Sequence, residues 1–218
     1  MFIGHFAVGL ASKRAAPRAS LGWLMAAPMA LDLLWPLFLI AGIERVRIVP
    51  GDTPFTPLAF DWYPWSHSLL MSVVWSLLAG GVYWGVTKYR RGAIVIGLGV
   101  FSHWVLDAIV HRPDLPLWPG APITVGLGLW NSVAGTIVVE VALFAAGAWL
   151  YARTTRARDG VGRWAYAGFL AFALIAYASS ILAGPPPSVT AIAYGGLTMY
   201  LIPVWAGWFD AHREVRGE

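Results

Sequence analysis

Three ionisable side chains, those of His103, Asp107 and His111, follow one another at intervals of four residues, and Asp114 comes three residues later, directly after a proline. Residues four positions apart in an α-helix lie on nearly the same face, so the first three side chains would form one stripe. The residues between them are almost all apolar. An imidazole and a carboxylate one turn apart can bind one metal ion, and ionisable groups are costly in so apolar a helix unless they bind something. The stripe therefore indicates a metal or ion site.

Four more ionisable residues lie in or beside apolar segments: His5, Asp32, His67 and Glu140. At a rise of 1.5 Å per residue, Asp32, His103 and Glu140 each lie about 16 Å from the end of their segments, near the middle of a bilayer. His5 is about 12 Å deep by the same measure, and His67 lies near the end of its helix. Residues from separate segments are thus expected at neighbouring depths, which supports one shared site.

Most of these residues also have a purely structural interpretation. A lone histidine such as His5 is more often hydrogen-bonded structure than a ligand. Ser66 could cap the helix that begins near His67. Hydrogen-bonded or turn-forming roles are equally open to four further residues, Asp32 beside Pro36, His111, Asp114 and Glu140. The pair of His103 and Asp107 is the hardest to explain in this way.

The composition indicates a membrane protein. Of the 218 residues, 58% are hydrophobic and 12% are charged, whereas about a quarter are charged in soluble domains. Uncharged runs of about 20 residues recur, each long enough to cross about 30 Å of hydrocarbon. The basic residues lie in short loops, so the net charge of +4 does not indicate nucleic-acid binding. Cysteine is absent, so a metal would be held by nitrogen and oxygen.

The predicted fold class is all-α, a polytopic helical bundle without strands. A short embedded helix is expected in Met1–Ser12, and no signal peptide is recognised there. The sequence is interpreted as a single transmembrane domain, 1–218, with the metal-site half at about 1–120 and the remaining spans in 121–218. Six spans are predicted, at about Leu21–Ile43, His67–Val86, Gly92–His111, Val125–Tyr151, Trp164–Ala183 and Val189–Phe209.

Lysine and arginine predict the orientation. One set of loops carries twelve of them and the other carries only Arg45, Arg47 and Arg112. Because basic loops stay in the cytoplasm, the first set and both termini are expected there. The predicted location is the inner membrane of a bacterium, with the bilayer itself as partner.

These residues resemble those of a known family, the small bacterial inner-membrane proteins called membrane-bound metal-dependent hydrolases. The resemblance covers about residues 1–120. It rests on His5 in a leading short helix, Asp32 in the first span, the element Ser66-His67-Ser68, and Ser102-His103 followed by Asp107. It implies that His5, Asp32, His67, His103 and Asp107 are metal ligands. Family members often carry a second acid beside the first-span aspartate, but Leu31 and Leu33 flank Asp32 here, which argues against a two-metal site.

Three histidines and two carboxylates suit Zn²⁺ best, with Mn²⁺ or Fe²⁺ as alternatives. The function predicted from the resemblance is hydrolysis of an ester or phosphoester, such as a lipid-linked substrate, by a metal-activated water. The candidates for acid–base catalysis are Asp114, Glu140 and His111. Two other functions stay open: an ion or proton transporter or channel that uses the same groups, and an assembly protein whose polar core only fixes helix packing.

Overall fold

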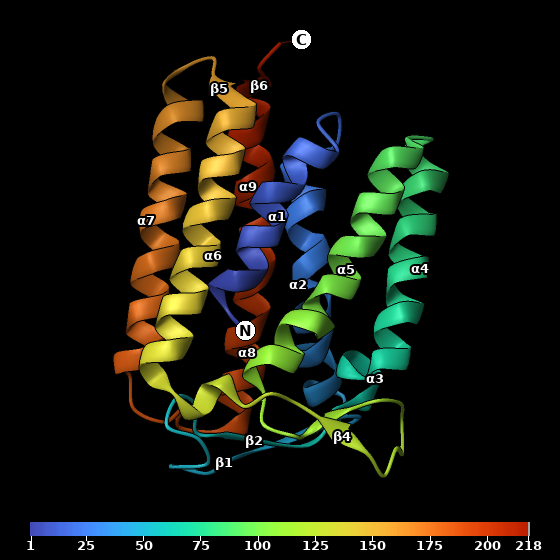
Figure 1. The fold of residues 1–218 in the computed structure, drawn as a ribbon, viewed down its shortest axis with the longest axis vertical. Coiled ribbons are helices and arrows are strands. Elements are labelled where there is room, and N and C mark those ends of the chain that lie inside the picture. The colour runs from blue at the N-terminus through green and yellow to red at the C-terminus, as the bar shows by residue number, and fades with distance from the viewer. Residues whose placement is uncertain (218) are drawn as a thin grey trace.

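The computed structural model describes residues 1–217. Long helices run roughly side by side, and short strands and loops cover the two ends of the bundle (Figure 1). The helices are α1 (Ile3–Ala15), α2 (Leu21–Ile40), α3 (Pro64–His67), α4 (Leu69–Thr87), α5 (Arg90–Val110), α6 (Val133–Thr154), α7 (Gly160–Leu182), α8 (Val189–Leu197) and α9 (Leu201–Ala211), with 3₁₀ turns η1 (Leu129–Asn131) and η2 (Thr198–Tyr200).

The predicted helical membrane bundle is confirmed. Within the described residues, six segments are long and apolar enough to cross a membrane: α2, α4, α5, α6, α7 and the continuous stretch Val189–Ala211, which contains α8 and α9. The largest error in the predicted bounds concerns α6, which begins at Val133 and not at Val125. The preceding residues form a strand and η1, and Ser132 then caps α6 by accepting a hydrogen bond from the Gly135 N–H at 3.1 Å.

The prediction that strands are absent was wrong. Residues 1–217 contain three antiparallel pairs: β1 (Arg45–Ile48) with β2 (Leu58–Trp62), β3 (Leu115–Pro116) with β4 (Thr124–Val125), and β5 (Thr155–Ala157) with β6 (Arg213–Val215). Each strand has five residues or fewer, too short for an alternating pattern to stand out in the sequence. Together, β1 to β4 cover the end of the bundle where α3 lies (Figure 1).

Helix α1 lies inside the bundle, in contact with α2, α5 and α6 (Figure 1). Gly147 of α6 makes this possible, because a side chain there would collide with the backbone of Ala7. The buried position of Met1 fits the expected embedded N-terminal helix, and the side of the membrane on which the termini lie stays a prediction. Met1 is buried near mid-height of the bundle, and only the other end of α1 approaches a loop region (Figure 1).

Two further contacts hold the helices of the bundle together. At Gly99, a Cβ would lie 2.9 Å from the Cβ of Ala27, so glycine allows α5 to pack tightly on α2 one turn before His103. At the opposite end of the bundle from β1 to β4, the Nζ of Lys13 lies 2.7 Å from Asp210 in a buried ion pair. That pair joins α1 to α9, and this structural role accounts for the two buried charges.

Candidate metal centre

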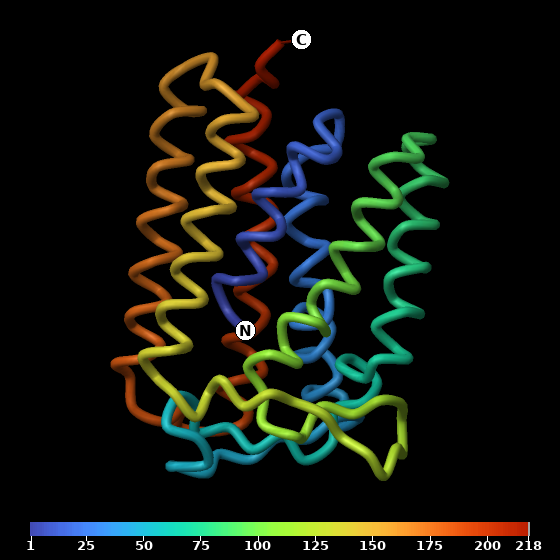
Figure 2. Tube along the Cα trace, in the orientation of Figure 1, coloured from blue at the N-terminus to red at the C-terminus, as the bar shows by residue number. Residues whose placement is uncertain are grey.

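Side chains from four helices converge in the middle of the bundle. His5 comes from α1, Asp32 from α2, His67 from α3, and His103 and Asp107 from successive turns of α5. Figure 2 shows α1, α2 and α5 running next to one another there. All of these side chains are buried except that of Asp32, which is partly exposed. The structure therefore brings together the five residues that the resemblance implied as ligands.

Two groups of three side chains, Asp32 with His67 and His103, and His5 with His103 and Asp107, each bring potential ligand atoms within 4.8 Å of one another. His67 Nε2 lies 3.3 Å from His103 Nε2 and 3.5 Å from Asp32 Oδ1. His103 Nε2 lies 3.8 Å from Asp32 Oδ1 and 3.0 Å from Asp107 Oδ2, which in turn is 3.8 Å from His67 Nε2. Two ligand atoms of a tetrahedral metal with bonds of 2.0–2.1 Å lie about 3.3–3.4 Å apart. These five distances scatter about that value, and the group of Asp32, His67 and His103 could hold a metal ion.

The hydrogen bonds of the two imidazoles fix their tautomers. His103 Nδ1 lies 2.7 Å from the Pro28 carbonyl oxygen, which can only accept, so Nδ1 carries the proton. Ser66 donates its hydroxyl hydrogen to Glu44 at 2.6 Å, so its oxygen must accept from His67 Nδ1, also at 2.6 Å. When these rings are neutral, the lone pair is on Nε2, the atom that faces the cluster.

Two facing lone pairs beside two carboxylates form a cradle for a cation. Neutral Nε2 atoms 3.3 Å apart cannot hydrogen-bond to each other. A buried arrangement of this kind is costly unless positive charge lies between the groups. Histidine ligands of metals usually donate their other N–H to a carbonyl or carboxylate, as His103 does directly and His67 does through Ser66.

His5 belongs to the second group, with His103 and Asp107. Its ring stacks on that of His103 with centroids 3.8 Å apart and an interplanar angle of 1°. A metal in the plane of one imidazole cannot also lie in the parallel plane of the other. His5 Nε2 instead lies 3.2 Å from Asp107 Oδ1, and neither of its ring nitrogens has a hydrogen-bond partner within residues 1–217. The five implied ligands thus form two overlapping groups of three that share His103.

Glu140 and the first residues of the chain close one side of the cluster. Glu140 Oε2 accepts hydrogen bonds from the backbone N–H groups of Phe2 at 2.8 Å and Gly4 at 3.1 Å. Its Oε1 is buried without a partner among the described residues. The amine of Met1 lies 2.6 Å from Asp107 Oδ1. Glu140 thus anchors the start of α1 and presents one free oxygen.

His111 and Asp114 form a pair at the end of α5. His111 Nδ1 lies 2.9 Å from Asp114 Oδ1, which also accepts from the Tyr63 hydroxyl at 3.1 Å. Burial lowers the pKa of His111 and raises that of Tyr63 well above its usual value, so the imidazole is neutral and the phenol keeps its proton. His111 therefore donates through Nδ1, and its Nε2 faces Asp107 Oδ2 at 3.9 Å.

A cavity of about 180 Å³ adjoins the cluster. Asp32, His67, Asp107, His111 and Glu140 contribute to its lining. Most of its remaining lining is apolar and includes the aromatic side chains of Trp35, Phe55, Phe60 and Trp130. The site therefore combines ionisable groups with a mostly apolar space, as ligand pockets commonly do.

Several residues of the site were missed by sequence reasoning. Glu44, Tyr63 and Phe60 belong to the segment around β1 and β2, which the sequence presents only as a loop rich in proline and aromatics. The alternative in which Ser66 caps a helix is not found. Ser68 caps α4 by accepting from the Met71 N–H at 3.2 Å, while Ser66 bridges Glu44 and His67.

Six apolar spans around a buried group of imidazoles and carboxylates define the class of this protein: a multi-pass membrane protein whose interior could hold a metal ion. The chain belongs to the family described as YdjM inner membrane protein, whose model matches residues 64–184, just over half of the chain. It is therefore a bacterial inner-membrane protein. The match includes His67, His103, Asp107 and Glu140 and extends beyond the region of about 1–120 on which the resemblance rested. Comparisons with curated proteins and with solved structures gave no match.

Proposed function

We propose that the protein is a membrane-embedded, metal-dependent hydrolase. The observation that carries the proposal is the set of four ligand atoms, His67 Nε2, His103 Nε2, Asp32 Oδ1 and Asp107 Oδ2, with measured separations of 3.0–3.8 Å. Imidazole and carboxylate ligands without sulfur favour Zn²⁺, with Mn²⁺ and Fe²⁺ as the alternatives. When bound, such an ion supplies Lewis-acid catalysis and activates water for hydrolysis at neutral pH.

His111 is the best placed general base. Its neutral ring donates through Nδ1 to Asp114, so Nε2 is free to take a proton from a water molecule at the cluster. Asp114 is a positioning residue, because its carboxylate also accepts hydrogen bonds from Tyr63 and from Arg112. Glu140 retains one free oxygen on the cavity and is the second candidate for proton transfer.

The volume of the cavity limits the size of the substrate group that can enter it. Its volume of about 180 Å³ is below the roughly 300–1,000 Å³ of pockets that enclose a whole small molecule. An ester or phosphoester group fits this space, whereas the chains of a lipid-linked substrate would have to remain outside it. The bilayer around the bundle makes a lipid-linked ester the natural substrate class.

The test is turnover by detergent-purified protein. Phosphate-ester, carboxylic-ester and peptide substrates are given to zinc-loaded protein, to chelated protein and to the His103→Ala variant. We expect hydrolysis of an ester class in the zinc-loaded wild type alone. If no substrate is hydrolysed in a metal-dependent way while proteoliposomes show ion flux that His103→Ala abolishes, the protein is a transporter and the proposal fails.

A further inference from the structure

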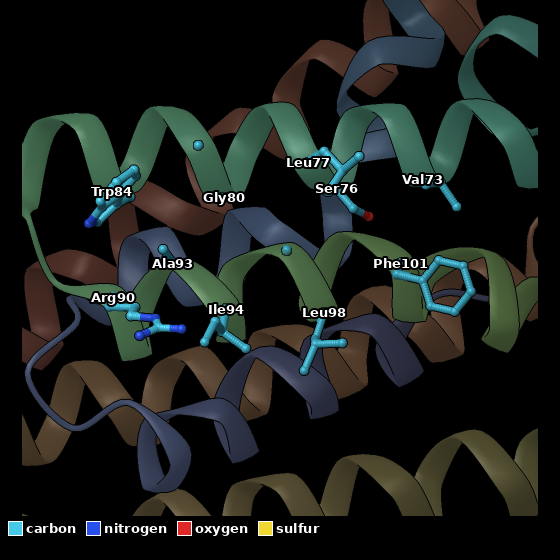
Figure 3. A pocket seen from close by; sticks show the side chains of 12 residues that line it. Val73, Ser76, Leu77, Gly80, Trp84, Arg90, Ala93, Ile94, Leu98 and Phe101 are labelled. Atoms are coloured by element: carbon cyan, nitrogen blue, oxygen red, sulfur yellow. The ribbon is translucent and has the colours of Figure 1, made fainter.

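A second cavity lies on the outer side of α4 and α5, and its lining ends at Phe101, two residues before His103. These two helices pack side by side at one edge of the bundle (Figure 1), and a groove of about 520 Å³ runs along them. Figure 3 shows Trp84 and Arg90 at one end of this groove and Val73 and Phe101 at the other. None of the candidate metal ligands contributes to its lining. Its walls are otherwise almost entirely apolar.

Glycines create the groove. A Cβ at Gly80 would lie 3.0 Å from the Ala93 carbonyl oxygen, and one at Gly97 would lie 3.2 Å from that of Ser76, so these residues let the two helices approach closely. Gly81 has a different role, because nothing lies within 4 Å of the position its Cβ would take. Glycine is an unfavourable residue inside a helix. At Gly81 it leaves open space on the side that faces the bilayer.

The length of the groove matches one leaflet. Arg90 and Phe101 are eleven residues apart on α5, which corresponds to about 16 Å at the helical rise of 1.5 Å per residue. One half of a hydrocarbon core of about 30 Å has nearly the same thickness. A groove that begins at a basic residue and ends near mid-membrane has the dimensions of a single extended acyl chain.

Charge selects the kind of lipid. Arg90 is exposed and forms no hydrogen bond or ion pair within residues 1–217. Lys88 and Arg91 are exposed nearby, and the sequence contains no aspartate or glutamate between Asp61 and Asp107. The counter-charge for this end of the groove must therefore come from outside the two helices. Anionic headgroups are attracted by basic residues at the membrane surface.

We propose that this groove binds one anionic phospholipid, with an acyl chain along α4 and α5 and its phosphate on Arg90. The proposal is independent of the proposed hydrolase function, because it uses none of the residues of the metal centre. It assigns the lipid to the leaflet on the side of the α4–α5 loop.

The first test compares two lipids with identical acyl chains, phosphatidylglycerol and phosphatidylcholine, by native mass spectrometry of the full-length protein in detergent. We expect phosphatidylglycerol to bind about fivefold more tightly, the contribution of roughly one basic residue at a membrane surface. Arg90→Gln should abolish this preference. Arg91→Gln makes the same change of charge on an exposed neighbour that does not line the groove, and it should keep the preference.

The second test fills the groove. Gly81→Leu adds a side chain where the structure has room, and Gly85→Leu adds the same side chain to α4 outside the groove, where nothing lies within 4 Å either. We expect Gly81→Leu to weaken the binding of both lipids severalfold and Gly85→Leu to bind as the wild type does. Retention of the monodisperse gel-filtration peak shows that each variant is folded. If Gly81→Leu does not fold, the comparison of Arg90→Gln with Arg91→Gln tests the proposal by itself.

Three results would overturn the proposal. Equal affinities of the wild type for the two lipids would show that the groove does not select an anionic headgroup. Equal losses in Arg90→Gln and Arg91→Gln would assign the effect to general loop charge. A wild-type dimer that Gly81→Leu dissociates, with lipid binding unchanged, would make the groove a contact between two copies of the chain.

Discussion

The Nε2 atoms of His67 and His103 face each other at 3.3 Å, although the two residues are 36 positions apart in the sequence. Each ring has committed its other nitrogen, one to the Pro28 carbonyl and one to Ser66. Neither ring can therefore turn its N–H inward without losing a buried hydrogen bond, which would cost about 1–3 kcal/mol. The pair is held in the tautomers that a cation requires before any cation is bound.

This arrangement predicts which histidines retain metal. His103→Ala removes one of the four converging atoms and should lose most of the bound metal, because the apolar surroundings offer no substitute ligand. His5→Ala should keep stoichiometric metal, since its ring lies parallel to that of His103 and a metal in the plane of one ring lies outside the plane of the other. Elemental analysis after gel filtration measures both. His212→Ala is the control, because it changes an exposed histidine that is bonded to Asp159. Full metal occupancy in His103→Ala would show that the metal does not bind at the proposed site.

Glu44 should set the affinity of the site without touching the metal. Its two carboxylate oxygens accept from the Ser66 N–H at 2.8 Å and from the Ser66 hydroxyl at 2.6 Å. An amide has only one accepting oxygen, so Glu44→Gln breaks one of these bonds and loosens His67. Loss of such a supporting partner typically lowers metal affinity 10–100-fold. Competition with a chromophoric chelator measures the change, and Glu214→Gln on exposed β6 should bind as the wild type does.

The positions of the helices could be predicted from the sequence, because long apolar runs have few alternatives to crossing a membrane. The same holds for the core of the site. The four-residue spacing of His103 and Asp107 puts both on one face of α5, and Asp32 lies at a similar depth in α2. Both inferences depend on local geometry and on depth alone.

The remaining features depend on contacts that a local pattern does not contain. Glu44 reaches Ser66 only because the segment around β1 and β2 folds back over the end of the bundle. The stacking of His5 on His103 depends on the rotation of α1, which Gly147 allows by admitting the Ala7 backbone. A single sequence specifies neither the fold-back nor the rotation, so the supporting residues were missed while the converging ones were found.

The membrane orientation is a further prediction, and it rests on the twelve-to-three distribution of basic residues. The chain has no cysteine, so single cysteines can be labelled without background. Pro122→Cys, at an exposed position in the β3–β4 loop, should react with an impermeant maleimide on intact cells. Lys88→Cys, exposed in the α4–α5 loop, should react only after the cells are opened. The reverse pattern would invert the topology.

Asp159 should make the stability of α7 depend on pH. Its carboxylate accepts from the Gly162 N–H at 2.9 Å and pairs with His212, and these contacts lower its pKa below the usual value of 3.8. A carboxyl group with a lowered folded-state pKa stabilises the fold above its unfolded pKa and loses this effect as the pH falls through the folded value.

The melting temperature of Asp159→Asn should therefore lie below that of the wild type at pH 6, and the difference should shrink as the pH falls below about 4. Ser188→Ala is the matched control, because Ser188 caps α8 by the same kind of bond, at 3.0 Å to the Ala191 N–H, and does not titrate. Its effect should be the same at both pH values. A constant difference for Asp159→Asn as well would show that only the neutral cap matters.

Asp114 should affect turnover and not metal binding. It holds His111 through a 2.9 Å hydrogen bond and is not one of the four converging atoms. Asp114→Asn keeps the size of the side chain but removes the charge that favours a proton on His111 Nδ1, so the ring can adopt the tautomer that cannot accept a proton at Nε2. We expect metal content to be unchanged and kcat to fall about 10²–10⁴-fold, the usual contribution of a positioned acid–base group.

Asp61→Asn is the matched control for this variant, because Asp61 is also paired with an arginine near the same end of the bundle, through two bonds to Arg47. Its turnover should equal that of the wild type. His111→Ala should lose about as much activity as Asp114→Asn, and the double variant should lose little more, because the two residues act as one unit. Additive losses in the double variant would show that Asp114 acts on the substrate by itself, and full activity in His111→Ala would exclude this pair from proton transfer.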